Sequence, residues 1–154
     1  RLFIGKSTTF ADNCKIGIPK FSTVVIGRDC MFSSKIFINA GDGHNIYNVE
    51  AGECINFTEE LIDTEKTTVR LGGHVWIGYE VVLLAGTDIG SGCIVGTRAV
   101  VKGKFPNNSI IVGSPARVVK KDIGWAREPF VTDIYADSSN VDHEFLQKTV
   151  EGEI

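Results

Sequence analysis

The chain has 154 residues, of which 43% are hydrophobic and 23% charged, and its formal net charge is −3 at pH 7. This length and composition predict one globular domain. No apolar run approaches the roughly twenty residues that a membrane-spanning helix needs, and the aromatic residues are not interleaved with the basic ones as in many nucleic-acid-binding proteins. We therefore expect a cytoplasmic protein with no membrane span and no nucleic-acid partner.

The first forty residues carry an apolar residue at every sixth position, in two runs separated by a skip of ten. The members are Ile4, Phe10, Ile16, Ile26, Phe32 and Ile38. The skip indicates a few extra residues at a corner around 18–20. Because Arg1 already lies in phase with this repeat and no signal peptide precedes it, we expect the native chain to begin further upstream.

The same repeat returns without a slip between residues 71 and 101. Its members are Leu71, Ile77, Leu83, Ile89, Val95 and Val101. Glycine follows four of them directly, and the residue four places after each of the first five is small or β-branched. A period of six fits neither the 3.6 of a helix nor the 2 of a flat strand. It predicts a β-solenoid in which each repeat forms one short strand.

Three repeats per turn would make this solenoid a three-sided column. Residues eighteen apart would then stack about 4.8 Å from one another, and their backbone groups would pair as in a parallel sheet. In this arrangement the large aliphatic residue fills the interior, the small residue fits the crowded corner, and glycine permits the turn. Three of the four cysteines, Cys14, Cys30 and Cys93, occupy the small interior position, which predicts buried structural thiols and not a disulfide or metal site.

The repeat is interrupted at His44, where the next apolar residue is due, and a long excursion over 45–68 follows. A side chain at this break can lie at the rim of the column. Asp42 stands two residues earlier and would share the face of His44 in a strand, so it could orient the imidazole or bind an acceptor molecule. The excursion also carries acids that could take that role, namely Glu50, Glu53, Glu59, Glu60, Asp63 and Glu65.

The charge changes sign along the last third of the chain. Residues 98–121 contain six basic side chains and no acidic one, whereas residues 122–154 contain eight acidic side chains against two basic ones. Uncompensated cations at the end of a solenoid favour a phosphate-bearing partner.

Several motifs resemble those of the hexapeptide-repeat acyltransferases, nearest to the bacterial sugar and polysaccharide O-acetyltransferases. They lie in residues 41–47, 73–78, 86–90, 106–109 and 113–120. The resemblance covers about 4–125 and implies an all-β, left-handed parallel β-helix over 1–121, a homotrimer, and acetyl-CoA as donor. The acidic extension over 122–154 would be partly helical, with Asn140 as a candidate cap before 141–146.

Acetyl transfer to a hydroxyl needs a general base, and His44 is the candidate because an ordinary histidine titrates near pH 6.5. His74 falls at a position that is usually an exposed polar residue in the family, and His143 lies outside the resemblance. Three histidines also invite comparison with the zinc-binding solenoid carbonic anhydrases. The histidine pair five positions apart that marks those enzymes is absent, so we expect no metal.

The resemblance also implies roles for residues of the later repeats. The main-chain amide of Tyr79 would stabilise the developing oxyanion. Trp76 would wall the channel for the pantetheine arm, or simply pack on the outer face. The remaining residues implied along the coenzyme are Gly78, Thr97, Lys102, Arg117 and Lys120. This chain reads Thr97-Arg98-Ala99 and Lys102-Gly103-Lys104 where relatives commonly carry fewer positive charges.

The resulting expectation is an O-acetyltransferase that acts on a saccharide or surface polysaccharide by direct transfer in a ternary complex. Tyr47 or Phe57 would stack on a sugar ring. One alternative is N- or O-acetylation of another small acceptor, such as an amino sugar or antibiotic. Another is a non-catalytic β-helical scaffold, which predicts no binding of acetyl-CoA and no consequence of losing His44.

Overall fold

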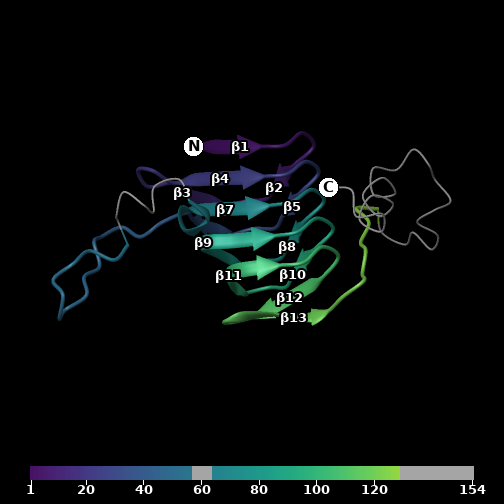
Figure 1. Cartoon of the computed structure of the whole chain (residues 1–154). Helices are drawn as coiled ribbons and strands as arrows, with labels where there is room; N and C mark the ends of the chain where they lie inside the picture. The colour runs from purple at the N-terminus through teal and green to yellow at the C-terminus, as the bar shows by residue number, and fades with distance from the viewer. Residues whose placement is uncertain (57–63, 129–154) are drawn as a thin grey trace.

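A computed structural model describes residues 1–56 and 64–128, which form a column of stacked coils built from short strands (Figure 1). The strands are β1 (Leu2–Ile4), β2 (Thr9–Phe10), β3 (Lys15–Gly17), β4 (Thr23–Ile26), β5 (Met31–Phe32), β6 (Phe37–Asn39), β7 (Thr68–Leu71), β8 (Trp76–Ile77), β9 (Val82–Ile89), β10 (Ile94–Val95), β11 (Val100–Phe105), β12 (Ile110–Gly113) and β13 (Ala116–Lys120). A short 3₁₀ helix, η2 (Glu65–Thr67), precedes β7. Within the described strands every pairing is parallel except that of β12 with β13.

The column has three faces. The first face contains β1, β4, β7 and the ends of β9 and β11, and the second contains β2, β5, β8, β10 and β12. The third face contains β3, β6 and the starts of β9 and β11. Strand β9 pairs with β6 at its start and with β7 at its end because it bends at Gly86, whose φ is +86°. The predicted three-sided parallel column is therefore confirmed.

The register confirms three six-residue repeats per coil. Ile77 pairs with Val95 and Leu83 pairs with Val101, both eighteen positions apart. Phe10 and Phe32 are twenty-two positions apart, because the first coil contains the four extra residues expected near 18–20. The excursion adds a larger insertion between β6 and β7 without disturbing the stacking on either side.

The predicted core positions are buried where strands stack on both sides. The six aliphatic residues from Leu71 to Val101 are each at most 2% exposed, and so are the small residues between them. In the first coil Ile4 is 46% and Phe10 37% exposed, because β1 and β2 each pair with a strand on one side only. Burial of the aliphatic stack supplies the main driving force, at about 25 cal/mol per Å² of apolar surface.

The expected role of the repeat glycines is wrong. The corner residue with positive φ stands three places after the aliphatic residue and is mostly not glycine: Ser7, Asn13, Asp29, Lys35, His74, Glu80, Arg98 and Asn108. The glycines serve a different purpose, which is the close approach of one coil to the next. A Cβ on Gly27 would lie 2.3 Å from the carbonyl oxygen of Gly72, and one on Gly78 would lie 2.8 Å from that of Val95.

The cysteines are free thiols. Cys30 and Cys93 are fully buried in the column, as expected, whereas Cys14 in the first coil is half-buried. Desolvation raises the pKa of both Cys30 and Cys93 to about 11, so each stays a neutral thiol at physiological pH. Neither thiol is suited to act as a nucleophile.

After β13 the chain runs back along the outside of the column (Figure 1). The further acidic stretch, with the helix expected at 141–146 after Asn140, and His143 lie outside the described residues, as do Phe57, Glu59, Glu60 and Asp63. In the described part of the chain, no helix has the length and apolar character needed to cross a membrane.

Candidate active site

His44 lies where the chain leaves the column. After β6 the backbone turns outward at Gly41, which packs against Pro19 and Ser22 of the preceding coil. Asp42 and His44 are both exposed on the segment that follows. Residues 46–55 then form a hairpin that projects away from the column (Figure 1). The imidazole is therefore accessible to a substrate, as its position at the break in the repeat predicts.

The base of this hairpin is fixed by Asn56, which sequence reasoning missed. Its Nδ2 donates to Asp42 Oδ2 at 3.0 Å and to the His44 carbonyl at 2.8 Å, while its Oδ1 accepts from the Ile46 amide at 2.7 Å. The Asp42 carboxylate is thus held by an amide, and no hydrogen bond joins it to the His44 ring in the described structure. One side chain ties together both ends of the segment that carries the histidine.

The hairpin itself is ordered by local hydrogen bonds. Tyr47 and Cys54 form an antiparallel bridge, and the Asn48 side chain accepts from the amides of Glu50 and Ala51 at the turn. Such an amide cap is a common way to stabilise a tight turn. The Tyr47 ring is 54% exposed, which leaves a face free for stacking.

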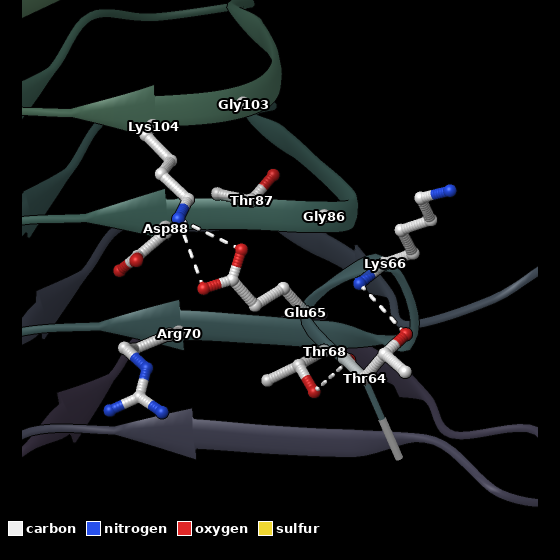
Figure 2. A pocket seen from close by; sticks show the side chains of 10 residues that line it. All are labelled: Thr64, Glu65, Lys66, Thr68, Arg70, Gly86, Thr87, Asp88, Gly103 and Lys104. Carbon is white, nitrogen blue, oxygen red and sulfur yellow. Dashed lines mark hydrogen bonds and ion pairs between the residues drawn. The ribbon is translucent and has the colours of Figure 1, made fainter. Parts of the chain in front are cut away.

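A cleft of about 500 Å³ lies at the same corner of the column, where the excursion returns (Figure 2). The residues that line it are glycines and residues with polar side chains from η2, β7, β9 and β11, among them Thr64, Thr68, Arg70 and Asp88. Glu65 closes one side through an ion pair with Lys104 at 2.8 Å, and this hydrogen bond to Lys104 lowers the pKa of Glu65.

Trp76 and Tyr79 lie elsewhere on the column. Trp76 is in β8 on the second face, where 39% of it is exposed, and Tyr79 follows at the corner between the second and third faces. No residue in the described ranges accepts a hydrogen bond from the Tyr79 main-chain N–H. Lys35 Nζ lies 5.2 Å from the Tyr79 ring centroid, and hydrogen bonding to Tyr79 raises the pKa of Lys35.

Within one chain His44 and Tyr79 stand at opposite ends of the third face. The amide of Glu80 bonds to the carbonyl of Ser34, which places Tyr79 level with the start of that face, whereas His44 follows its end. The extended residues that follow the turn at Lys35, from Ile36 to Ala40, span about 13 Å at the usual rise of a strand. A single copy therefore does not bring the two groups together.

The residues implied along the coenzyme lie on the later coils. Thr97 is exposed at the same corner as Tyr79, Gly78 is half-buried beside it, and Lys102 is exposed at the end of the third face. Arg117 and Lys120 are exposed on β13, which pairs antiparallel with β12. The structure thus distributes these five residues over two faces near one end of the column.

The expectation that this basic stretch is uncompensated is only partly right. Arg98 forms an ion pair with Glu80 at 2.8 Å, and Lys104 pairs with Glu65. Hydrogen bonding to Arg98 accordingly lowers the pKa of Glu80. Lys102, Lys120 and Lys121 form no ion pair with the residues described. The free cations are therefore fewer than the sequence suggests, and they cluster toward the last coils.

The expectation for His74 is wrong. The side chain is 1% exposed, and its two ring nitrogens lie 2.7 Å from Asp29 and 2.8 Å from the carbonyl of Trp125. Its partners stand 45 and 51 positions away in the sequence, which hid the contact. Among residues 1–56 and 64–128, His, Cys, Asp and Glu side chains nowhere gather in a group of three that could hold a metal ion.

No protein-family model matches the chain. A polysialic acid O-acetyltransferase of Neisseria meningitidis is 35% identical over 133 residues, which cover 86% of this chain and 58% of that protein. The solved structure of the polysialic acid O-acetyltransferase OatWY is 30% identical, with a TM-score of 0.72 over 94% of this chain and 74% of that one. The chain belongs to the hexapeptide-repeat acetyltransferase family.

Other solved structures agree with this family. The polysialic acid-specific acetyltransferase NeuO aligns with a TM-score of 0.83 and 27% identity, over 96% of this chain and 58% of that one. A hexapeptide-repeat acetyltransferase of Vibrio cholerae, solved with acetyl coenzyme A, shares the fold at 19% identity and a TM-score of 0.52, over 77% of this chain and 70% of that one. The chain spans 59% or less of the length of the first four curated relatives it matches.

Proposed function

We propose that this hexapeptide-repeat protein is an acetyl-CoA-dependent O-acetyltransferase whose acceptor is a hydroxyl of a saccharide or polysaccharide. The observation that carries the proposal is the exposed His44 on a braced hairpin, in a chain whose relatives are named polysialic acid O-acetyltransferases. The left-handed sense of the coil and the homotrimer, both implied by the family resemblance, are part of the same proposal.

The chemistry requires one base and one oxyanion donor. In a ternary complex the His44 imidazole takes the proton of the acceptor hydroxyl as its oxygen attacks the thioester carbon. The carbonyl oxygen becomes negative, and the Tyr79 N–H stabilises it, a contribution of about 2.7–4 kcal/mol for a single such donor. The C–S bond then breaks, and the imidazolium returns its proton to the departing thiolate of coenzyme A.

The brace around Asn56 supports the role of His44. General-base catalysis depends on a fixed distance between base and hydroxyl, and a displacement of 1 Å can cost about a hundredfold in rate. Two of the Asn56 bonds go to backbone groups of His44 and Ile46, so they fix the main chain that carries the imidazole. Asp42 would complete the brace or contact the acceptor.

The cleft at the excursion supports a sugar as the acceptor. It lies at the corner where His44 leaves the column, and threonine hydroxyls, a guanidinium and a carboxylate line it. These groups can both donate to and accept from the several hydroxyls of a saccharide. Tyr47 on the projecting hairpin would add an aromatic surface for a sugar ring.

The phosphates of coenzyme A would be met by exposed cations of the last coils. We expect Arg117→Ala and Lys120→Ala each to raise the KM for acetyl-CoA by about tenfold with little change in kcat, because a phosphate contact is made in the ground state and the transition state alike. Initial-rate kinetics measure the effect. Arg98→Ala is the matched control, since Arg98 is already paired with Glu80. An unchanged KM in both variants would contradict these contacts.

The separation of His44 from Tyr79 supports a site shared between copies. If the histidine of one copy acts with the Trp76 and Tyr79 of its neighbour, the site is incomplete without a partner. A cyclic homotrimer repeats one such interface three times. The family resemblance implies this assembly.

Subunit mixing tests the shared site. His44→Ala and Trp76→Ala proteins, each inactive alone, are unfolded together and refolded as a mixture. About one quarter of randomly assembled interfaces then combine an intact histidine with an intact tryptophan, so about that share of wild-type activity is expected to return. Each protein refolded alone is the control. If the mixture stays as inactive as its components, the site is not shared.

A further inference from the structure

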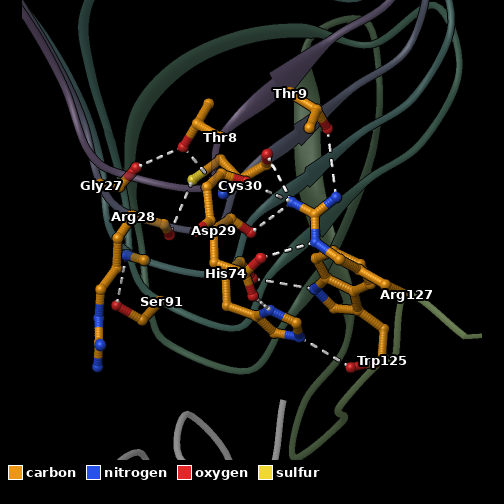
Figure 3. A network of polar contacts seen from close by, with 12 residues as sticks. Thr8, Thr9, Gly27, Arg28, Asp29, Cys30, His74, Ser91, Trp125 and Arg127 are labelled. Atoms are coloured by element: carbon orange, nitrogen blue, oxygen red, sulfur yellow. Dashed lines mark hydrogen bonds and ion pairs between the residues drawn. The ribbon is translucent and has the colours of Figure 1, made fainter. Parts of the chain in front are cut away.

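A buried polar cluster joins the equivalent corner turns of two neighbouring coils to the segment after β13 (Figure 3). We call it the clasp, and it consists of Asp29, His74, Trp125 and Arg127. Asp29, His74 and Trp125 are at most 7% exposed. Asp29 and His74 hold equivalent corner positions with positive φ in neighbouring coils, so their side chains emerge side by side. None of these residues has a part in the proposed chemistry.

The contacts of His74 require two ring protons. Its Nδ1 lies 2.7 Å from Asp29 Oδ2, and its Nε2 lies 2.8 Å from the Trp125 carbonyl oxygen. A carboxylate and a carbonyl are both acceptors, whereas a neutral imidazole has one N–H. The other oxygen of Asp29 accepts from Arg127 Nε at 2.6 Å, which favours the ionised carboxylate. The geometry therefore assigns an imidazolium to His74.

Trp125 makes three contacts with His74, one ring stack and two hydrogen bonds. The two rings stack with centroids 4.0 Å apart and planes inclined by 8°. The indole Nε1 donates to the His74 carbonyl at 3.0 Å, in exchange for the bond that His74 Nε2 gives to the Trp125 carbonyl. A cation stacked on an indole is attracted by its π face, more strongly when both are desolvated.

Arg127 extends the clasp to the first coil of the column. Its Nη2 donates to the carbonyls of Asp29 and Cys30, and its Nη1 reaches Thr9 in β2 at 3.2 Å. Within the clasp, the Asp29 carboxylate and the Arg127 guanidinium are the charged groups that accompany His74. Cys30 stands beside Asp29 as a neutral thiol, because burial raises its pKa to about 11. Arg28 contributes its carbonyl, which accepts from the His74 amide.

The clasp reaches the proposed active site through one aromatic contact. The Trp125 and Trp76 rings lie 5.9 Å apart and are inclined by 48°, within the range of favourable aromatic pairs. We propose that Trp125, locked by the Asp29–His74 ion pair, is a positioning residue that fixes the Trp76 indole beside the bound donor. This inference rests on the proposed function for the role of Trp76, but the contact itself can be tested without any turnover.

The chain offers a direct probe because Trp76 and Trp125 are its two tryptophans. Trp125→Phe and Trp125→Leu each leave Trp76 as the sole tryptophan, which can be excited selectively, and they differ in whether an aromatic ring remains against it. We expect the leucine variant to show lower Trp76 anisotropy and stronger quenching by acrylamide than the phenylalanine variant. We also expect its kcat/KM for acetyl-CoA to fall by about tenfold, while the KM for the saccharide stays constant.

A second pair of measurements covers the case in which Trp125→Leu fails to fold. In Trp76→Phe the sole tryptophan is Trp125, which the stacked His74 ring and its hydrogen bonds hold in place. Adding Asp29→Asn, which preserves volume but not charge, should loosen His74 and make Trp125 more accessible to acrylamide. On the Trp125→Phe background, Asp29→Asn should again lower Trp76 anisotropy.

These outcomes separate the inference from the function on which it rests. Wild-type protein that transfers no acetyl group overturns the proposed function, while the fluorescence comparison still decides whether the clasp holds Trp76. Equal Trp76 anisotropy and quenching in the folded phenylalanine and leucine variants would overturn the positioning role. Acrylamide quenching of Trp125 that Asp29→Asn leaves unchanged would overturn the lock by the Asp29–His74 pair.

Discussion

Replacing His44 by alanine is expected to lower acetyl transfer by about 10²–10⁴-fold, the usual contribution of a general base, with the column and its affinity for acetyl-CoA preserved. The side chain is exposed and forms no hydrogen bond with the described residues, so little folding energy depends on it. The brace by Asn56 uses the His44 carbonyl, which alanine retains. Initial rates measure acetyl transfer, calorimetric titration measures the affinity for acetyl-CoA, and a thermal melt measures the stability of the column.

Glu50→Ala is the matched control for this variant. Glu50 is also exposed on the projecting hairpin, and its main-chain amide, not its carboxylate, bonds to Asn48. We expect wild-type rates from it. If His44→Ala turns over at the wild-type rate, the imidazole is not the base and the proposed mechanism fails.

Replacing Gly27 by alanine is expected to destabilise the column by about 3 kcal/mol, at the upper end of the cost of overpacking. The added Cβ would lie 2.3 Å from the Gly72 carbonyl oxygen and 2.6 Å from the Gly73 nitrogen. These are backbone atoms of the next coil, so they cannot rotate away, and the coils must separate. Since a domain has only about 5–15 kcal/mol of stability, we expect the melting temperature to fall by about 10 °C.

Gly43→Ala is the control for the stability test. A Cβ on Gly43 would have no heavy atom within 4 Å, and its φ is not positive. Its melting temperature should equal that of the wild type. If Gly27→Ala has the same melting temperature as the wild type, the repeat glycines are not required as points of close contact between coils.

The column could be predicted because the residues that specify it lie within single six-residue repeats. An aliphatic residue every six positions and a small residue four places later specify strand, corner and interior within one repeat, and the spacing of eighteen gives the register. The glycine role was not predictable in the same way. Sequence alone records that Gly27 and Gly78 follow an aliphatic residue, but whether they enable a turn or a close approach depends on the neighbouring coil.

The side-chain partners depend on contacts between coils. Glu80 compensates Arg98 one full coil later, and Glu65 compensates Lys104 across the excursion, so charge counted by segment overestimates the free cations. One feature of the sequence could have predicted the contact between Asp29 and His74. Both residues directly precede the small residue of a repeat, so they become neighbours once the excursion is taken out of the count. No feature of the sequence predicts the contacts of Asn56, because the hairpin lies outside the six-residue repeat.

One measurement tests directly whether this protein acetylates a saccharide hydroxyl. The wild-type protein is incubated with acetyl-CoA labelled in the acetyl group and with a panel of acidic and neutral polysaccharides, oligosaccharides and aminoglycosides. We expect label in an ester on a saccharide hydroxyl, released by mild base, and none with His44→Ala. Label in a base-stable amide on an aminoglycoside, or no transfer to any acceptor while acetyl-CoA is bound, would contradict it.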